Sequence, residues 1–120
     1  ARLMLALKKA LVKVDPVPTL IFDEIDANVG GRIGSVVGKK LKEVSQARQV
    51  LLITHLPQIA SFADQHLKVS KITRDNRSLT QVSLLTKDQR VEELAKMLSG
   101  ERETQISKDH AKEMLRTAKA

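Results

Sequence analysis

Three carboxylates follow a short apolar run in the stretch TLIFDEID, which covers residues 19–26. Asp23 and Glu24 come directly after Phe22, and Asp26 lies two residues further on. Neighbouring like charges repel, and a carboxylate at the edge of an apolar core loses hydration, so this arrangement costs stability. A bound cation would offset both costs. The stretch therefore predicts a site that holds a cation.

A second polar pair, Thr54 and His55, follows the apolar run VLLI. In open parallel sheets, the loops beyond the carboxyl ends of the strands form the ligand crevice. Phosphoryl transfer to water needs a carboxylate that helps to hold Mg²⁺, a base that orients the water, and a polar contact on the terminal phosphate. Two neighbouring strand ends with Asp23, Glu24 and the Thr54–His55 pair could supply all three.

The elements that must position these side chains are predicted from the spacing of apolar residues. Residues 19–23 and 49–54 are apolar runs without alternation, typical of strands covered on both faces in a parallel sheet. Residues 32–46 have helical spacing. The predicted inward face of this helix consists of Ile33, Val36, Val37, Leu41 and Val44. Strand, helix and strand in this order predict a βαβ unit.

The later part of the chain predicts an antiparallel hairpin and two helices. Residues 66–75 and 78–86 alternate as strands with one wet face, and we expect the turn around Asn76. A loop and short helix are expected just before this hairpin. Residues 87–100 and the segment that runs to Leu115 have helical spacing, with Gly100 at the position of a C-terminal cap.

The first segment, residues 2–14, reads as an amphipathic helix that the sequence DPVP then breaks. No capping residue precedes Arg2, so we expect that Ala1 is not the natural start. With 120 residues, 42% of them hydrophobic, the chain is predicted to be a single domain, residues 1–120. The expected fold class is α/β, with parallel strands and crossover helices followed by a β-hairpin and C-terminal helices.

The composition narrows the function further. The chain has no cysteine, which excludes a disulfide framework and a thiolate zinc site. No apolar run approaches the roughly 20 residues that span a bilayer, so we expect no membrane partner and a cytoplasmic location. The net charge of +7 suits phosphate-rich partners, including DNA, but only Phe22 and Phe62 are aromatic, which disfavours stacking on single-stranded nucleic acid.

The sequence also carries a resemblance to a known family. TLIFDE resembles the Walker B motif of ABC-type ATPases. The strings FDEID, VLLITHLPQIASFADQHLKVSK and VEELAKMLSG are similar to the C-terminal ATPase segment of the RecN family of bacterial SMC-like recombination and repair proteins. The strongest of these clues is THLPQIA followed by QHLKVSK, and the resemblance covers essentially all 120 residues.

The resemblance implies ATP and Mg²⁺ as cofactors and a role for each candidate residue. Asp23 would bind Mg²⁺ through water, Glu24 would be the catalytic base, and His55 would be the switch histidine that touches the γ-phosphate. Asp26 would belong to the D-loop near the dimer interface. Family members often carry a glycine where this D-loop reads Ala27-Asn28, while Gly30 and Gly31 are expected to keep the loop flexible.

No G-x-x-x-x-G-K-[ST] motif occurs, and GSVVGKK at residues 34–40 has the wrong spacing and lies in a predicted helix. The resemblance therefore implies the C-terminal lobe of a split head whose P-loop lobe lies upstream. Such a lobe alone is expected not to hydrolyse ATP. In the intact protein, the resemblance implies a homodimer of heads that works on DNA double-strand breaks in the bacterial nucleoid.

Other interpretations remain open at this point. The chain could be the head segment of another SMC/Rad50-like ATPase, or a non-catalytic basic module for DNA binding or dimerisation. Asp23 and Glu24 could be a solvated strand end, and His55 could hydrogen-bond only its own turn. We expect a structural role for His66 and a solvated His110. The lysines of the two predicted helices, among them Lys39, Lys40 and Lys42, are most simply solvated.

Overall fold

The computed structural model describes residue 6 and residues 18–23, 28–100 and 102–119. Its elements, in chain order, are β1 (Thr19–Phe22), α2 (Gly31–Ser45), β2 (Gln49–Leu52), α3 (Pro57–Ala60), β3 (Leu67–Arg74), β4 (Arg77–Leu84), α4 (Lys87–Ser99) and α5 (Gln105–Lys119). The predicted helix at the start of the chain lies outside the described residues except for Ala6, which is helical. Among the described helices, none is long and apolar enough to cross a membrane.

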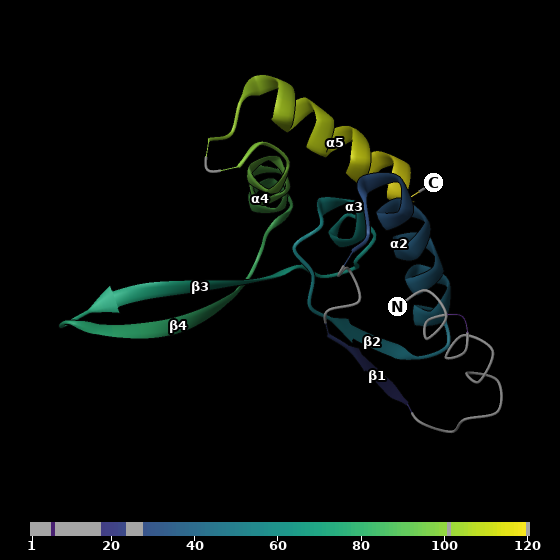
Figure 1. The fold of residues 1–120 in the computed structure, drawn as a ribbon, viewed down its shortest axis with the longest axis horizontal. Coiled ribbons are helices and arrows are strands. Elements are labelled where there is room, and N and C mark those ends of the chain that lie inside the picture. Colours follow the sequence, from purple (N-terminus) through teal and green to yellow (C-terminus); the bar gives the residue numbers. More distant parts are fainter. Residues whose placement is uncertain (1–5, 7–17, 24–27, 101, 120) are drawn as a thin grey trace.

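The predicted βαβ unit is confirmed. β1 and β2 pair in parallel, with Thr19 opposite Gln49 and Phe22 opposite Leu52. The ladder extends one step further, because the Ile53 amide donates to the Phe22 carbonyl oxygen at 3.0 Å. α2 connects the two strands and packs on one face of the pair (Figure 1). The carboxyl ends of both strands therefore lie at the same edge of the sheet.

The core beneath α2 is formed by the buried side chains of Phe22, Val37, Leu41 and Ile59. Four of the five residues predicted to face inward from α2 are buried or half-buried. The prediction for the fifth residue, Val36, is wrong, because its side chain is 48% exposed. The buried arc of α2 includes Gly34 and Gly38, which face α3, so the helix is rotated and Val36 lies on its solvent side.

The expectation that both faces of the parallel strands are covered is wrong for the described residues. Phe22 is 3% exposed, whereas Ile21 and Ile53 are 61% and 62% exposed and Leu51 is 49% exposed. The side chains of a strand alternate between its two faces, and α2 covers one of them. The second face of the β1–β2 pair is therefore apolar and open within the described part of the chain.

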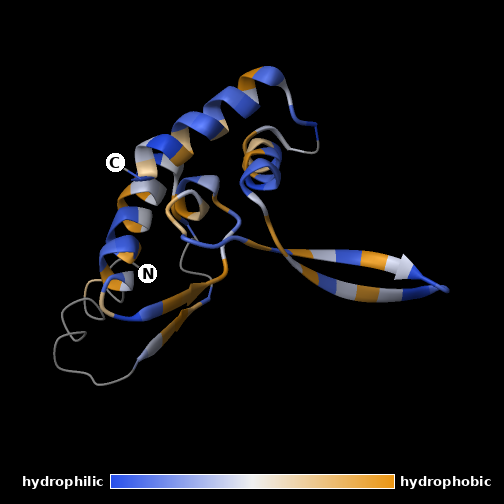
Figure 2. Cartoon of the chain, turned by 180° about the vertical axis from the view of Figure 1, so that it is seen from behind, coloured by the Kyte–Doolittle hydropathy of each residue, from blue (hydrophilic) through white to orange (hydrophobic). Residues whose placement is uncertain are grey.

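The predicted hairpin is confirmed and projects from the rest of the molecule (Figure 1). Asp75 and Asn76 form its two-residue turn with φ angles of 51° and 59°, the left-handed pair that defines a type I′ turn. The prediction of one wet face is wrong for the described residues, because the apolar face of the hairpin is exposed as well. Its exposed pairs are Leu67 with Leu84 and Val69 with Val82. Figure 2 shows hydrophobic bands along both strands of the hairpin.

The two C-terminal helices form a second core with α3. Thr86 begins α4 with a capping box, in which the Gln89 amide donates to Thr86 Oγ1 at 3.3 Å and the Thr86 amide donates to Gln89 Oε1 at 3.0 Å. Gly100, with φ of 84°, ends α4 as predicted. The buried members of this core are Ala60, Leu94, Ala95 and Ala111.

Candidate functional site

Asp23 and His55 both lie at the carboxyl edge of the β1–β2 pair. Asp23 is the first residue after β1, and its side chain is exposed. His55 lies three residues beyond Leu52, the end of β2, and is also exposed. The parallel register brings the two strand ends side by side, so the carboxylate and the imidazole belong to one rim.

The loop between β2 and α3 is ordered by its own polar groups. Thr54 Oγ1 accepts a hydrogen bond from the Leu56 amide at 3.0 Å. Leu56 caps α3, and Pro57 follows at the first helical position, where its missing amide proton costs nothing. The sequence THLP therefore forms a turn between β2 and α3, and His55 is exposed in this turn.

The other two predicted site residues, Glu24 and Asp26, lie outside the described residues. The structure resumes at Asn28, whose φ of 63° is left-handed. Asparagine tolerates this conformation better than other residues that carry a Cβ. Gly30 has φ of −84° and caps α2, and Gly31 is the first residue of that helix, so Asn28 is the described residue of this loop with a left-handed backbone.

Sequence reasoning missed the glycine face of α2. A Cβ added at Gly34 would meet Gln58 Cβ at 3.2 Å, and one added at Gly38 would meet the Gln58 carbonyl oxygen at 3.1 Å and Phe62 Cδ2 at 2.5 Å. Gly31, one turn earlier, faces the Gln58 amide group. These glycines let α3, and with it the His55 loop, approach α2 closely. Their spacing of three and four residues in a predicted helix was the signal that could have found this face.

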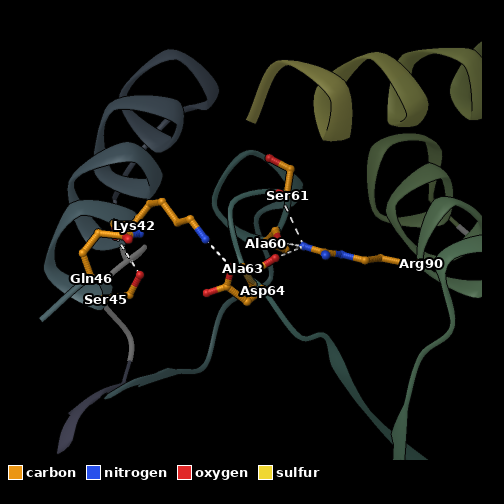
Figure 3. A network of polar contacts seen from close by, with 8 residues as sticks. All are labelled: Lys42, Ser45, Gln46, Ala60, Ser61, Ala63, Asp64 and Arg90. Atoms are coloured by element: carbon orange, nitrogen blue, oxygen red, sulfur yellow. Dashed lines mark hydrogen bonds and ion pairs between the residues drawn. The ribbon is translucent and has the colours of Figure 1, made fainter. Parts of the chain in front are cut away.

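Sequence reasoning also missed Arg90 on α4. Its Nη2 donates to the carbonyl oxygens of Ala60, Ser61 and Ala63 at 2.9, 3.3 and 2.5 Å (Figure 3). Burial lowers the pKa of Arg90 below its usual range, and the charge of Asp64 opposes this shift. On the other side of α3, Asp64 pairs with Lys42 of α2, so this lysine is not simply solvated as predicted. α3 is thus linked to helices on both sides.

The remaining histidines fit the expected roles. His66 is half-buried just before β3, and its backbone carbonyl oxygen accepts from the Leu85 amide at 3.0 Å, which closes the base of the hairpin. Burial and the charge of Arg90 lower the pKa of His66. His110 is exposed on α5. Within the described ranges, no group of three or more His, Cys, Asp or Glu residues could hold a metal ion.

The described donors fit a magnesium–nucleotide ligand in their chemistry. Mg²⁺ usually keeps several waters and takes one or two carboxylates together with phosphate oxygens, and Asp23 offers an accessible carboxylate. The exposed imidazole of His55 can donate a hydrogen bond, and a phosphate oxygen is a suitable acceptor. A separate cavity of about 470 Å³, lined by residues that include Leu41, Leu52 and Phe62, contains neither residue.

Comparison with known proteins finds relatives that share one name, DNA repair protein RecN. The chain is 41% identical over 120 residues to the DNA repair protein RecN of Streptomyces coelicolor and 42% identical over 118 residues to that of Bacillus subtilis. It is 44% identical over 115 residues to RecN of Rickettsia bellii. These alignments cover 96–100% of the chain but only 20–21% of each relative, so the chain spans about a fifth of their length. No family model matches it.

A solved structure supports the same relationship. It comes from work on the ATP-driven dimerisation and DNA-stimulated activation of SMC ATPases, and it matches with a TM-score of 0.64 and 28% sequence identity. The match covers 85% of this chain and 58% of that one. The α/β arrangement of a parallel strand pair, a hairpin and two terminal helices is thus that of part of an SMC-type ATPase head.

Proposed function

We propose a role in ATP hydrolysis for this chain, starting from the premise that it is a RecN-type segment of an SMC-like ATPase head. The observation that carries the proposal is the shared rim of the two parallel strands. Asp23 and His55 follow the two strands that end at this rim, and phosphoryl transfer needs a carboxylate for the metal and a polar contact on the terminal phosphate. The chain is similar to RecN along all 120 of its own residues. In the intact protein, this segment would act in the repair of DNA double-strand breaks.

Each site residue has a defined part in this proposal. The Asp23 carboxylate would help to hold Mg²⁺ through water, and the His55 imidazole would contact the γ-phosphate. Glu24 accepts a proton from the attacking water, because a carboxylate at this position can act as a general base. Asp26 contributes at the interface with a second head. ATP with Mg²⁺ supplies the phosphoryl group and the charge neutralisation that its transfer needs.

The proposal includes a division of labour between two lobes. The chain contains no P-loop motif, so the backbone amides that cradle the phosphates would come from another part of the polypeptide. The small share of each relative that the chain spans leaves ample room for that lobe. A base without the phosphate cradle lacks positioning, and we therefore expect residues 1–120 alone to be inactive.

The first experiment measures ATP hydrolysis with Mg²⁺ by this chain alone, by the chain joined to its P-loop lobe, and by the joined protein with Glu24→Gln. We expect turnover only from the joined protein, and a loss of about 10²-fold or more in Glu24→Gln with ATP binding retained. Glu92→Gln, at an exposed position on α4, is the matched control and should hydrolyse normally. Unchanged turnover in Glu24→Gln would remove the role of Glu24, and hydrolysis by the chain alone would refute the division between lobes.

We also propose DNA and a second head as partners of the intact protein, which would place it at the bacterial nucleoid. The support is the DNA repair relatives, the SMC neighbour whose dimerisation is ATP-driven, and the net charge of +7. Lys39 and Lys40 are neighbours on α2 and both are exposed, so they form a basic surface that can be tested by substitution. If this surface contacts DNA, Lys39→Glu with Lys40→Glu should weaken binding and reduce its salt dependence. Unchanged salt-sensitive binding would exclude this surface.

A further inference from the structure

The loop that carries His55 depends on α3 for its position. On one side, the loop is continuous with β2, which pairs with β1. On the other side, it enters α3, a single turn that covers only Pro57–Ala60. An isolated helical turn is unstable, because ordering its residues costs more than its few hydrogen bonds return. Contacts with other elements must therefore hold α3 in place.

α2 holds one side of α3 through close packing. At Gly38, the backbone approaches so closely that an added Cβ would meet the Phe62 ring at 2.5 Å and the Gln58 carbonyl oxygen at 3.1 Å. This packing fixes how near α3 lies to α2. The end of the turn is also held by hydrogen bonds to its carbonyl groups, among them a long one from the Ala63 amide to the Ala60 carbonyl oxygen at 3.2 Å.

Arg90 supplies a further donor to this end of α3 from the other side. A single nitrogen, Nη2, lies 2.9 Å from the Ala60 carbonyl oxygen, 3.3 Å from that of Ser61 and 2.5 Å from that of Ala63. All three oxygens are at the C-terminal end of α3 or just beyond it, where a positive charge is also favoured. We refer to this contact as the Arg90 clamp (Figure 3).

The clamp is built on a well-fixed base. Arg90 lies one turn into α4, and its backbone amide donates to the Thr86 carbonyl oxygen at 2.9 Å, directly behind the Thr86–Gln89 capping box. Leu94 and Ala95, one turn further, are completely buried and belong to the same core as Ala60. The position of the guanidinium group is therefore set by the second core of the molecule.

We propose that Arg90 is a positioning residue for His55. The Arg90 clamp holds the end of α3, and α3 in turn holds the end of the Thr54–Leu56 loop. α4, which packs against α5, therefore determines the position of the His55 imidazole. The inference rests on the role proposed above for His55. Arg90 acts through the backbone of α3 and is not a catalytic residue.

The test uses the full-length protein, with its P-loop lobe, and four forms of it: wild type, Arg90→Met, Arg90→Lys and Arg116→Met. Arg90→Met keeps much of the aliphatic side chain and removes the donors. Arg90→Lys places up to three donors on one nitrogen, so it should restore part of the clamp. Arg116→Met is the matched control, because Arg116 is exposed on α5 and pairs with Glu113, one turn before it on the same helix.

We expect Arg90→Met to lower kcat by about tenfold to a hundredfold, because a small misplacement of a catalytic group has effects of this size. The Kd for ATP should change less than about twofold, since the proposed phosphate cradle belongs to the other lobe. Arg90→Lys should lie between Arg90→Met and wild type. All assays are made at a temperature at which every variant is folded, so that a purely structural role would leave kcat unchanged.

Hydrogen exchange gives a second readout that does not involve turnover. In Arg90→Met, amides in residues 56–64 should exchange faster than in wild type, while the exchange of amides in α2 should not change. In Arg116→Met, the amides of both segments should exchange as in wild type. Unchanged exchange in this segment would refute the clamp. Faster exchange with normal kcat, in a protein that Glu24→Gln and His55→Ala both inactivate, would refute the positioning role alone. If neither of those variants affects turnover, the proposed function itself fails.

Discussion

Gly38 on α2 and Phe62 beyond α3 approach each other so closely that a Cβ at position 38 would lie 2.5 Å from Phe62 Cδ2. Real Cβ atoms do not reach such distances, so a side chain at this position forces a ring or a backbone to move. The contact holds the βαβ unit against the segment that follows the His55 loop.

Gly38→Ala should therefore destabilise the chain. Overpacking costs about 1–3 kcal/mol, and alanine regains about 1 kcal/mol through its helix propensity, so we expect a net loss. Urea unfolding followed by circular dichroism measures it. Gly31→Ala is the control, because among the described residues the added Cβ meets the end of the flexible Gln58 side chain, at 3.2 Å. Equal stabilities of the two variants would contradict the tight contact at Gly38.

The two faces of β1 should respond differently to substitution. Phe22 is 3% exposed and Ile21 is 61% exposed, although they are neighbours in the chain. Phe22→Ala should cost about 3–5 kcal/mol and leave the chain largely unfolded. Ile21→Thr keeps the β-branched shape, and we expect a change within about 0.5 kcal/mol. The fraction of folded chain, measured by circular dichroism and urea titration, checks both. A large loss in Ile21→Thr would show that this face is covered.

The hairpin turn gives a local prediction. Asn76 has φ of 59°, which a β-branched residue adopts only at a cost of about 1–2 kcal/mol. Asn76→Val should therefore speed amide exchange in β3 and β4, and Asn76→Gly, which suits the type I′ turn, should slow it or leave it unchanged. Exchange in α4 and α5 serves as the internal reference. Identical exchange of the hairpin in both variants would contradict the left-handed turn.

His66 predicts a pH dependence of stability. Burial and then the charge of Arg90 lower the pKa of His66 below the ordinary 6.5, so the folded chain binds this proton more weakly than the unfolded chain. The contribution of neutral His66 to the free energy of unfolding is complete above pH 6.5 and is lost as the pH falls through the lowered pKa of the folded state. Unfolding free energies measured between about pH 8 and about pH 5 should show this decline.

Substitution separates His66 from the other titrating groups. His66→Gln should flatten the dependence over this range, whereas His110→Gln, at an exposed position on α5, should preserve it. NMR titration of the imidazole protons measures the His66 pKa directly. A His66 pKa at or above 6.5 would overturn the prediction.

The positions of most helices and strands could be predicted from the amino-acid sequence. Apolar runs and helical spacing located β1, α2, β2, α4 and α5 to within a few residues, because each pattern reflects one face turned to a core. Asn76 and Gly100 marked a turn and a helix end, because their left-handed backbone follows from their own chemistry. The strings around Asp23 and His55 were sufficient to identify the family resemblance that the relatives support.

How these elements pack against one another could not be predicted from the sequence. Val36 was wrongly placed in the core, because the rotation of α2 depends on how closely α3 approaches Gly34 and Gly38. The open faces of β1 and of the hairpin follow from what packs on them, which a strand pattern does not encode. The Arg90 clamp joins residues about thirty positions apart in the sequence. Sequence periodicity reports which side of an element is apolar, whereas partners distant in the chain exist only once the chain has folded.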